Sequence, residues 1–131
     1  MIDSSTETPG RYRQLLQVGP HALHADLDAP SGGDGSAPTG HDYFDAALAA
    51  CKTLTATFYA KKNGFPLERV ESRVERDASK EREGVYRLKV RLAFHGPLTD
   101  EQRTRLYNAV AKCPVHKLMT TTEVIVDTEP L

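Results

Sequence analysis

The sequence of 131 residues has no tryptophan, only two cysteines and no marked excess of either charge. Its 17 Lys and Arg residues nearly balance 18 Asp and Glu residues, which argues against a surface that binds nucleic acid. No apolar run is long enough to cross a bilayer, and the polar first residues, MIDSSTETPG, lack the basic and apolar regions of a secretory signal. We therefore expect a cytoplasmic protein with no nucleic-acid and no membrane partner.

The scarcity of cysteine leaves several readings of the two that are present, Cys51 and Cys113. A lasting disulfide is not expected in a reducing cytosol, so a catalytic or redox pair gains weight. Two buried, inert thiols are the alternative, because free cysteine is commonly buried. A metal site is a third reading, since Cys113 and His116 have ligand-like C-x-x-H spacing, but one such pair without a second is a weak signal. We expect neither a metal nor a cofactor.

The length fits one domain, residues 1–131, and we expect residues 1–10 to be poorly ordered. Residues 11–18 and 21–28 alternate partly between apolar and polar on either side of a Gly-Pro pair, which predicts a β-hairpin. Residues 29–40, APSGGDGSAPTG, are rich in Gly and Pro and have no periodicity. They predict a loop.

A long helix is predicted from Asp42 to Asn63, because this stretch holds no Pro or Gly and ends in two lysines before Gly64. Its middle, AALAACKTLTATFYA, is apolar or small on most faces, as in a largely buried central helix. The face that carries Cys51 consists of Phe44, Ala47, Leu48, Leu54, Thr55 and Phe58. A lone monomer would leave part of this helix in water, so we expect a homodimer.

Further strands and a second helix follow. Residues 68–77 and 85–94 alternate as an antiparallel pair with one solvated face, and residues 123–127, EVIVD, predict a last strand. A capping box at Thr99 to Gln102 begins a helix that ends at Cys113. Pro114 favours a new helical turn whose partial positive charge would favour a thiolate at Cys113. The order ββαββαβ predicts an α+β fold, with an antiparallel sheet packed on the central helix.

Two segments together resemble the osmotically inducible protein C and organic hydroperoxide resistance family. They are HDYFDAALAACKTLTATFYAKKNGFPLERV and NAVAKCPVHKLM, within a resemblance that covers about residues 11–128. The resemblance implies an intertwined α+β homodimer and a thiol-dependent peroxidase that acts on organic hydroperoxides. It also implies that Cys51 is the peroxidatic thiol, which becomes a sulfenic acid, and that Cys113 resolves it to a disulfide reduced by an external dithiol.

The resemblance further implies a carboxylate near the start of the helix, usually Glu, and an N-terminal arginine, often in a Gly-Gly-Arg setting. The corresponding carboxylate is Asp42, about 13 Å from Cys51 along a straight helix. Asp42 would therefore act in the partner chain's site, or the helix would begin later than predicted, or Asp42 serves only the helix dipole. This chain has no Gly-Gly-Arg, and Arg13, with Arg11, is the nearest candidate. The alternative function is a non-enzymatic stress protein that binds a hydrophobic ligand in a cleft beside Cys51.

Overall fold

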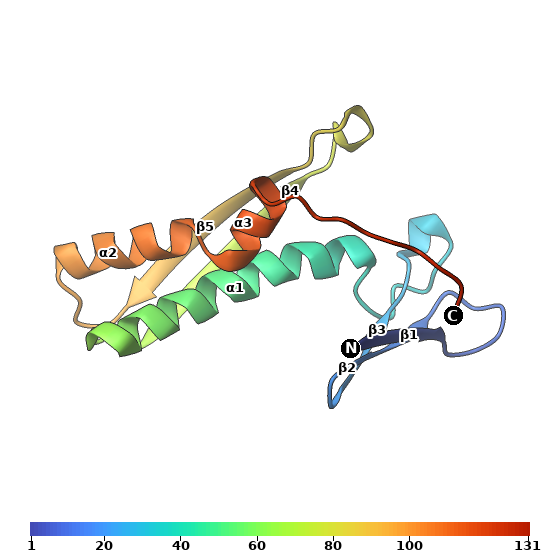
Figure 1. Cartoon of the computed structure of the whole chain (residues 1–131), viewed down its shortest axis with the longest axis horizontal. Coiled ribbons are helices and arrows are strands. Elements are labelled where there is room, and N and C mark those ends of the chain that lie inside the picture. The colour runs from blue at the N-terminus through green and yellow to red at the C-terminus, as the bar shows by residue number, and fades with distance from the viewer. The chain divides into compact units, whose positions relative to one another are not determined.

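A computed structural model describes all 131 residues of the chain (Figure 1). The chain forms two compact units, Met1–Phe44 and Asp45–Leu131. The long helix α1 (Gly40–Asn63) begins in the first unit and continues into the second. None of the helices combines the length and the apolar character that crossing a membrane requires.

The first unit contains a three-stranded antiparallel sheet in the order β1-β2-β3, formed by β1 (Ile2–Thr6), β2 (Gln14–Val18) and β3 (His21–Ala25). The predicted hairpin is confirmed as β2 and β3, with Val18 opposite His21 across the turn. Gly19 in that turn has a φ of 57°, a left-handed conformation that glycine adopts without a Cβ clash. The predicted loop contains one short 3-10 helix, η1 (Ala29–Ser31), before α1 begins.

The second unit packs helices and a hairpin around the remainder of α1, with α2 alongside α1 in Figure 1. Its further elements are β4 (Arg69–Asp77), η2 (Glu81–Glu83), β5 (Arg87–His95), α2 (Asp100–Ala111) and α3 (Pro114–Thr120). The predicted strand pair is confirmed as an antiparallel ladder in which Val74 lies opposite Val90. The predicted capping box is also present, because Thr99 and Gln102 bond reciprocally at the start of α2.

The core of the second unit lies between α1 and α2. On α1 the buried residues recur at every fourth position, which places them in one stripe along the helix. The buried apolar side chains are Leu48, Ala56 and Ala60 of α1, Leu106 and Val110 of α2, and Cys113. Two large side chains on another face of α1, Leu54 and Phe58, are 70% and 69% exposed. A single chain therefore buries one stripe of the central helix and leaves the other face open, as the apolar pattern predicted.

The α+β class is confirmed, but the element order differs from the prediction at both ends of the chain. The prediction of a strand at residues 123–127 is wrong, since this segment has no regular structure. The side chains of Val124, Ile125 and Val126 are exposed and no strand pairs with the segment, and a strand is not stable without such pairing. β1 was not predicted, because its five residues are all exposed and show no apolar alternation. The strands also form two separate sheets rather than one.

Candidate active site

Cys51 lies in the middle of α1 and is half-buried as a free thiol. Its Sγ accepts a hydrogen bond from the backbone N–H of Val115, at a distance of 3.5 Å. The hydroxyl of Thr55, one turn further along α1, lies 3.9 Å from the same sulfur. A donor directed at sulfur stabilises negative charge there, so the arrangement suits a nucleophilic thiolate.

Cys113 is fully buried and occupies the N-cap position of α3. Its backbone is extended, its carbonyl accepts the first helical hydrogen bond from Lys117, and Pro114 is the first helical residue. The first N–H groups of a helix have no partner within the helix, and proline has none to offer. The N–H of Val115 is therefore free to meet Cys51. Val115 lies only two residues after Cys113, so the turn that begins at Cys113 reaches Cys51 through this backbone N–H.

Lys52, the residue after Cys51, is the only charged residue in the core, apart from Asp26 of the first unit. Its Nζ donates to the carbonyl oxygens of Val110 and Ala111 at 2.6 and 3.3 Å and lies 3.1 Å from Nδ1 of His116. The two carbonyls end α2, where carbonyl groups have no partner within the helix and the helix dipole is negative. Burial, and then the charge of Lys52, hold the pKa of His116 below its ordinary value. A lysine ammonium group can only donate, so Nδ1 is the acceptor in this contact.

Asp42 lies in the first turn of α1, where it forms a reciprocal capping pair with Thr39. The carboxylate Oδ2 accepts from the N–H of Thr39 at 2.9 Å, and the N–H of Asp42 donates to the Thr39 hydroxyl at 3.1 Å. This arrangement satisfies two of the donors that a helix start leaves unpaired. The capping contact accounts for an acidic residue at this position, and a role for Asp42 at a reactive sulfur stays a prediction.

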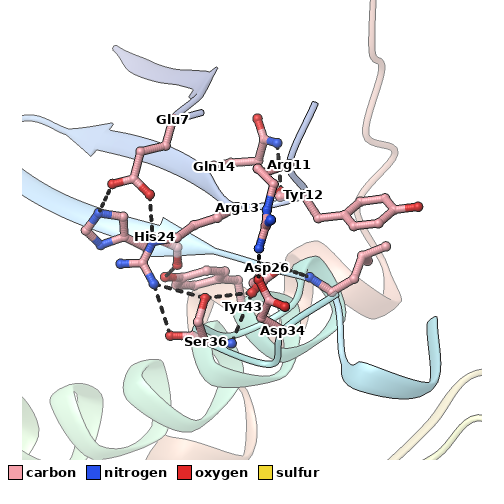
Figure 2. Close-up of polar contacts among 11 residues, drawn as sticks. Glu7, Arg11, Tyr12, Arg13, Gln14, His24, Asp26, Asp34, Ser36 and Tyr43 are labelled. Carbon is pink, nitrogen blue, oxygen red and sulfur yellow. Dashed lines mark hydrogen bonds and ion pairs between the residues drawn. The ribbon is translucent and has the colours of Figure 1, made fainter. Parts of the chain in front are cut away.

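Arg13 belongs to a polar cluster of the first unit (Figure 2). Its Nε lies 2.7 Å from a carboxylate oxygen of Glu7, whose other oxygen faces His24, and its Nη1 donates to the hydroxyl of Ser36 at 2.9 Å. Ser36 in turn donates to Asp26 from its hydroxyl and its N–H, which lowers the pKa of that buried carboxyl. Both ion-pair and hydrogen-bond partners of Arg13 thus lie within its own unit, and its role in thiolate activation stays a prediction.

Residues 33–129 match the family model described as OsmC-like protein. The chain belongs to the OsmC-like family. No curated protein matches the sequence. The expected resemblance to osmotically inducible protein C and organic hydroperoxide resistance proteins is therefore confirmed at the level of the family.

Solved structures share the fold of this OsmC-like protein at low sequence identity. An OsmC-like protein of Mycoplasma pneumoniae has a TM-score of 0.73 at 14% identity, with 92% of this chain and 86% of that chain covered. The organic hydroperoxide resistance protein OsmC of Legionella pneumophila has a TM-score of 0.63 at 23% identity, with 92% and 88% covered. The organic hydroperoxide resistance protein OhrB of Bacillus subtilis has a TM-score of 0.60 at 20% identity, with 92% and 90% covered.

Sequence analysis identified the two cysteines as candidate site residues but did not identify Lys52. One signal was available: a lysine shares the four-residue stripe of Leu48, Ala56 and Ala60, which is otherwise apolar. A charge on a core stripe requires buried partners, although the stripe does not tell which ones. The structure contains no group of three or more His, Cys, Asp or Glu side chains suited to a metal ion, and the Nδ1 of His116 faces an ammonium group.

Proposed function

We propose that this OsmC-like protein is a thiol-dependent peroxidase that reduces organic hydroperoxides to alcohols, with Cys51 as the nucleophile and Cys113 as the resolving thiol. The hydrogen bond from the Val115 amide to the Cys51 sulfur carries the proposal. It supplies a donor for the thiolate and keeps that sulfur beside the turn that begins at Cys113. The proposal applies to this chain what the names of its structural neighbours say of organic hydroperoxide resistance.

In the first step the Cys51 thiolate attacks one peroxide oxygen, the O–O bond breaks, and the other oxygen leaves as an alkoxide that takes up a proton to become the alcohol. Cys51 is then a sulfenic acid. In the second step the Cys113 thiol attacks the Cys51 sulfur, water leaves, and a disulfide joins the two residues. An external dithiol then reduces this disulfide by thiol exchange and is itself oxidised by two electrons. The complete burial of Cys113 would protect the resolving thiol from peroxide in solution.

The apolar surroundings of Cys51 favour a peroxide with an alkyl chain over hydrogen peroxide. Leu54 and Phe58 lie three and seven residues after Cys51, on its side of α1, and both are exposed in a single chain. The same exposed face supports the proposal of a homodimer, because contiguous exposed apolar surface is a common feature of subunit interfaces. Contributions of Asp42 and Arg13 to the site, and a cytoplasmic location, belong to the same proposal.

The test is a thiol count after reaction with cumene hydroperoxide. Reduced protein should lose two free thiols per chain, and Cys51→Ser should lose none. Cys113→Ser should complete the first step and then accumulate the sulfinic acid of Cys51, because no internal thiol traps the sulfenic acid. Mass spectrometry of the intact chain distinguishes these products.

The exposed apolar face of α1 also favours a second candidate, a non-enzymatic protein that binds a hydrophobic ligand beside Cys51. That function predicts that both thiols survive exposure to the peroxide. It also predicts that a fatty acid protects Cys51 from alkylation without any oxidation. Two unreacted thiols in the wild-type protein would therefore replace the peroxidase proposal with this one.

A further inference from the structure

Lys52 carries a charge that is 3% exposed and has no carboxylate partner among its contacts. Burying an ammonium group is costly unless each of its three N–H donors finds an acceptor. Three acceptors surround Nζ: two carbonyl oxygens at the end of α2 and the Nδ1 of His116 in α3. The negative end of the α2 dipole compensates the charge in place of a carboxylate. Such a complete arrangement indicates a fixed position for the ammonium group.

The three acceptors lie on both sides of the turn that contains Cys113. Val110 and Ala111 precede it on α2, and His116 follows it on α3. The side chain of Lys52 therefore joins α1 to the two ends of this turn at once. Its neighbour Cys51 meets the same turn through the N–H of Val115.

We propose that Lys52 is a positioning residue: its ammonium group ties the end of α2 and His116 of α3 to α1, and so keeps Cys113 and the Val115 amide against Cys51. The inference rests on the proposed function for its consequence in catalysis, where it sets how fast the Cys51 sulfenic acid is resolved. The positioning itself is independent of peroxide. The positioning by Lys52 determines the effective concentration of the Cys113 thiol at Cys51.

That effective concentration can be measured with glutathione. Two cysteine thiols and one glutathione disulfide give the intramolecular disulfide and two molecules of reduced glutathione, so two electrons pass from protein to glutathione and two protons go with them. The equilibrium constant of this exchange rises with the effective concentration of Cys113 at Cys51. A variant that only loses stability, equally in its reduced and oxidised forms, leaves this constant unchanged. Positioning is thereby separated from a general structural role.

The experiment compares wild-type protein with Lys52→Met, which keeps the apolar stem and removes the donors, and with Lys61→Met, an exposed lysine of the same helix. Lys52→Met should lower the equilibrium constant roughly ten- to a hundredfold, because a misplacement of about 1 Å between reacting groups can cost two orders of magnitude. Lys61→Met should match the wild type. Equal constants for wild type and Lys52→Met would overturn the proposal.

A second measurement needs no variant and covers the case in which Lys52→Met does not fold. Nitrogen NMR of the wild-type His116 ring should show the proton on Nε2 and an unprotonated Nδ1 that accepts from Lys52. A proton on Nδ1 in the neutral ring would overturn the proposal. Neither measurement uses peroxide, so the two proposals can fail separately. If the protein does not react with cumene hydroperoxide but shows the expected glutathione equilibrium and His116 tautomer, the peroxidase function is refuted and the positioning role of Lys52 is retained.

Discussion

The exposed face of α1 gives a prediction about self-association. Leu54 and Phe58 are separated by one helical turn, and about seven tenths of each side chain is exposed. Replacing both with alanine removes apolar surface but no core packing, because neither side chain is buried in the single chain. Alanine is also the best helix former, so α1 should keep its helical structure. The double variant L54A/F58A therefore tests the homodimer without a large effect on the fold.

The expected magnitude follows from the exposed fractions. Full burial of a Leu or Phe side chain contributes about 1.5–3 kcal/mol, so the exposed seven tenths of each could contribute about 1–2 kcal/mol in an interface. A symmetric dimer buries both side chains from both protomers. The double variant should then lose about 4–8 kcal/mol of association free energy, which weakens the dimer by roughly three to six orders of magnitude at about 1.4 kcal/mol per tenfold change.

Sedimentation velocity over a range of concentrations measures the effect. Wild-type protein should sediment as a dimer at micromolar concentration and L54A/F58A as a monomer. Tyr107→Ala is the matched control, because Tyr107 is an aromatic residue of α2 with a similar exposed fraction but outside the proposed interface. A dimer of unchanged affinity in L54A/F58A, or a monomeric wild-type protein, would refute the reasoning from the exposed face.

Three further predictions concern stability. Leu106→Ala removes a fully buried side chain of α2, and the free energy of unfolding from urea titration should fall by about 2–5 kcal/mol; a loss below about 1 kcal/mol would mean that the site collapses or is not in the core. Thr99→Ala removes the hydroxyl that accepts from Gln102, which should cost about 0.5–2 kcal/mol in the same titration, while an unchanged value would contradict a stabilising cap. The pKa of His116 is lower in the folded chain than in the unfolded chain, so the unfolded chain takes up the proton first as the pH falls. The neutral ring therefore contributes its full share of the folding free energy above the unfolded pKa of about 6.5. This contribution is lost as the pH falls toward the folded pKa. His116→Asn, which keeps an acceptor and does not titrate, should lose less stability than the wild type between about pH 7 and pH 5. Parallel losses would count against the partly buried His116–Lys52 contact.

The elements that sequence analysis predicted well are those whose signals are local. α1 has an uninterrupted helical stretch with cations and glycine at its end, and α2 begins with a capping box whose two hydrogen bonds are both formed. The hairpin of β2 and β3 has its register set by a two-residue turn at Gly19. In each case the residues that determine the structure are close neighbours in the chain, so composition and periodicity were sufficient.

The errors concern segments whose structure depends on a distant partner. β1 shows no alternation, and it forms a strand because the edge of β2 offers backbone partners to it. The apolar segment at residues 123–127 has a strand's composition but pairs with no strand of the chain. Side-chain pattern alone does not report whether a free sheet edge is within reach, and this limits prediction for edge strands in general.

The difference between local and distant determinants also explains why the two cysteines could be predicted as site residues and the positioning residue Lys52 could not. Cys51 and Cys113 were visible because the chain has only two cysteines, whereas Lys52 is one of 17 basic residues and most of these lie in water. What distinguishes Lys52 is that its acceptors, the carbonyls of Val110 and Ala111 and the ring of His116, become its neighbours only when α1, α2 and α3 pack together. Every residue has a backbone carbonyl, so no sequence motif distinguishes the two that accept from Lys52. The contact of this buried ammonium group with acceptors on both sides of the Cys113 turn can therefore be identified only in the folded chain.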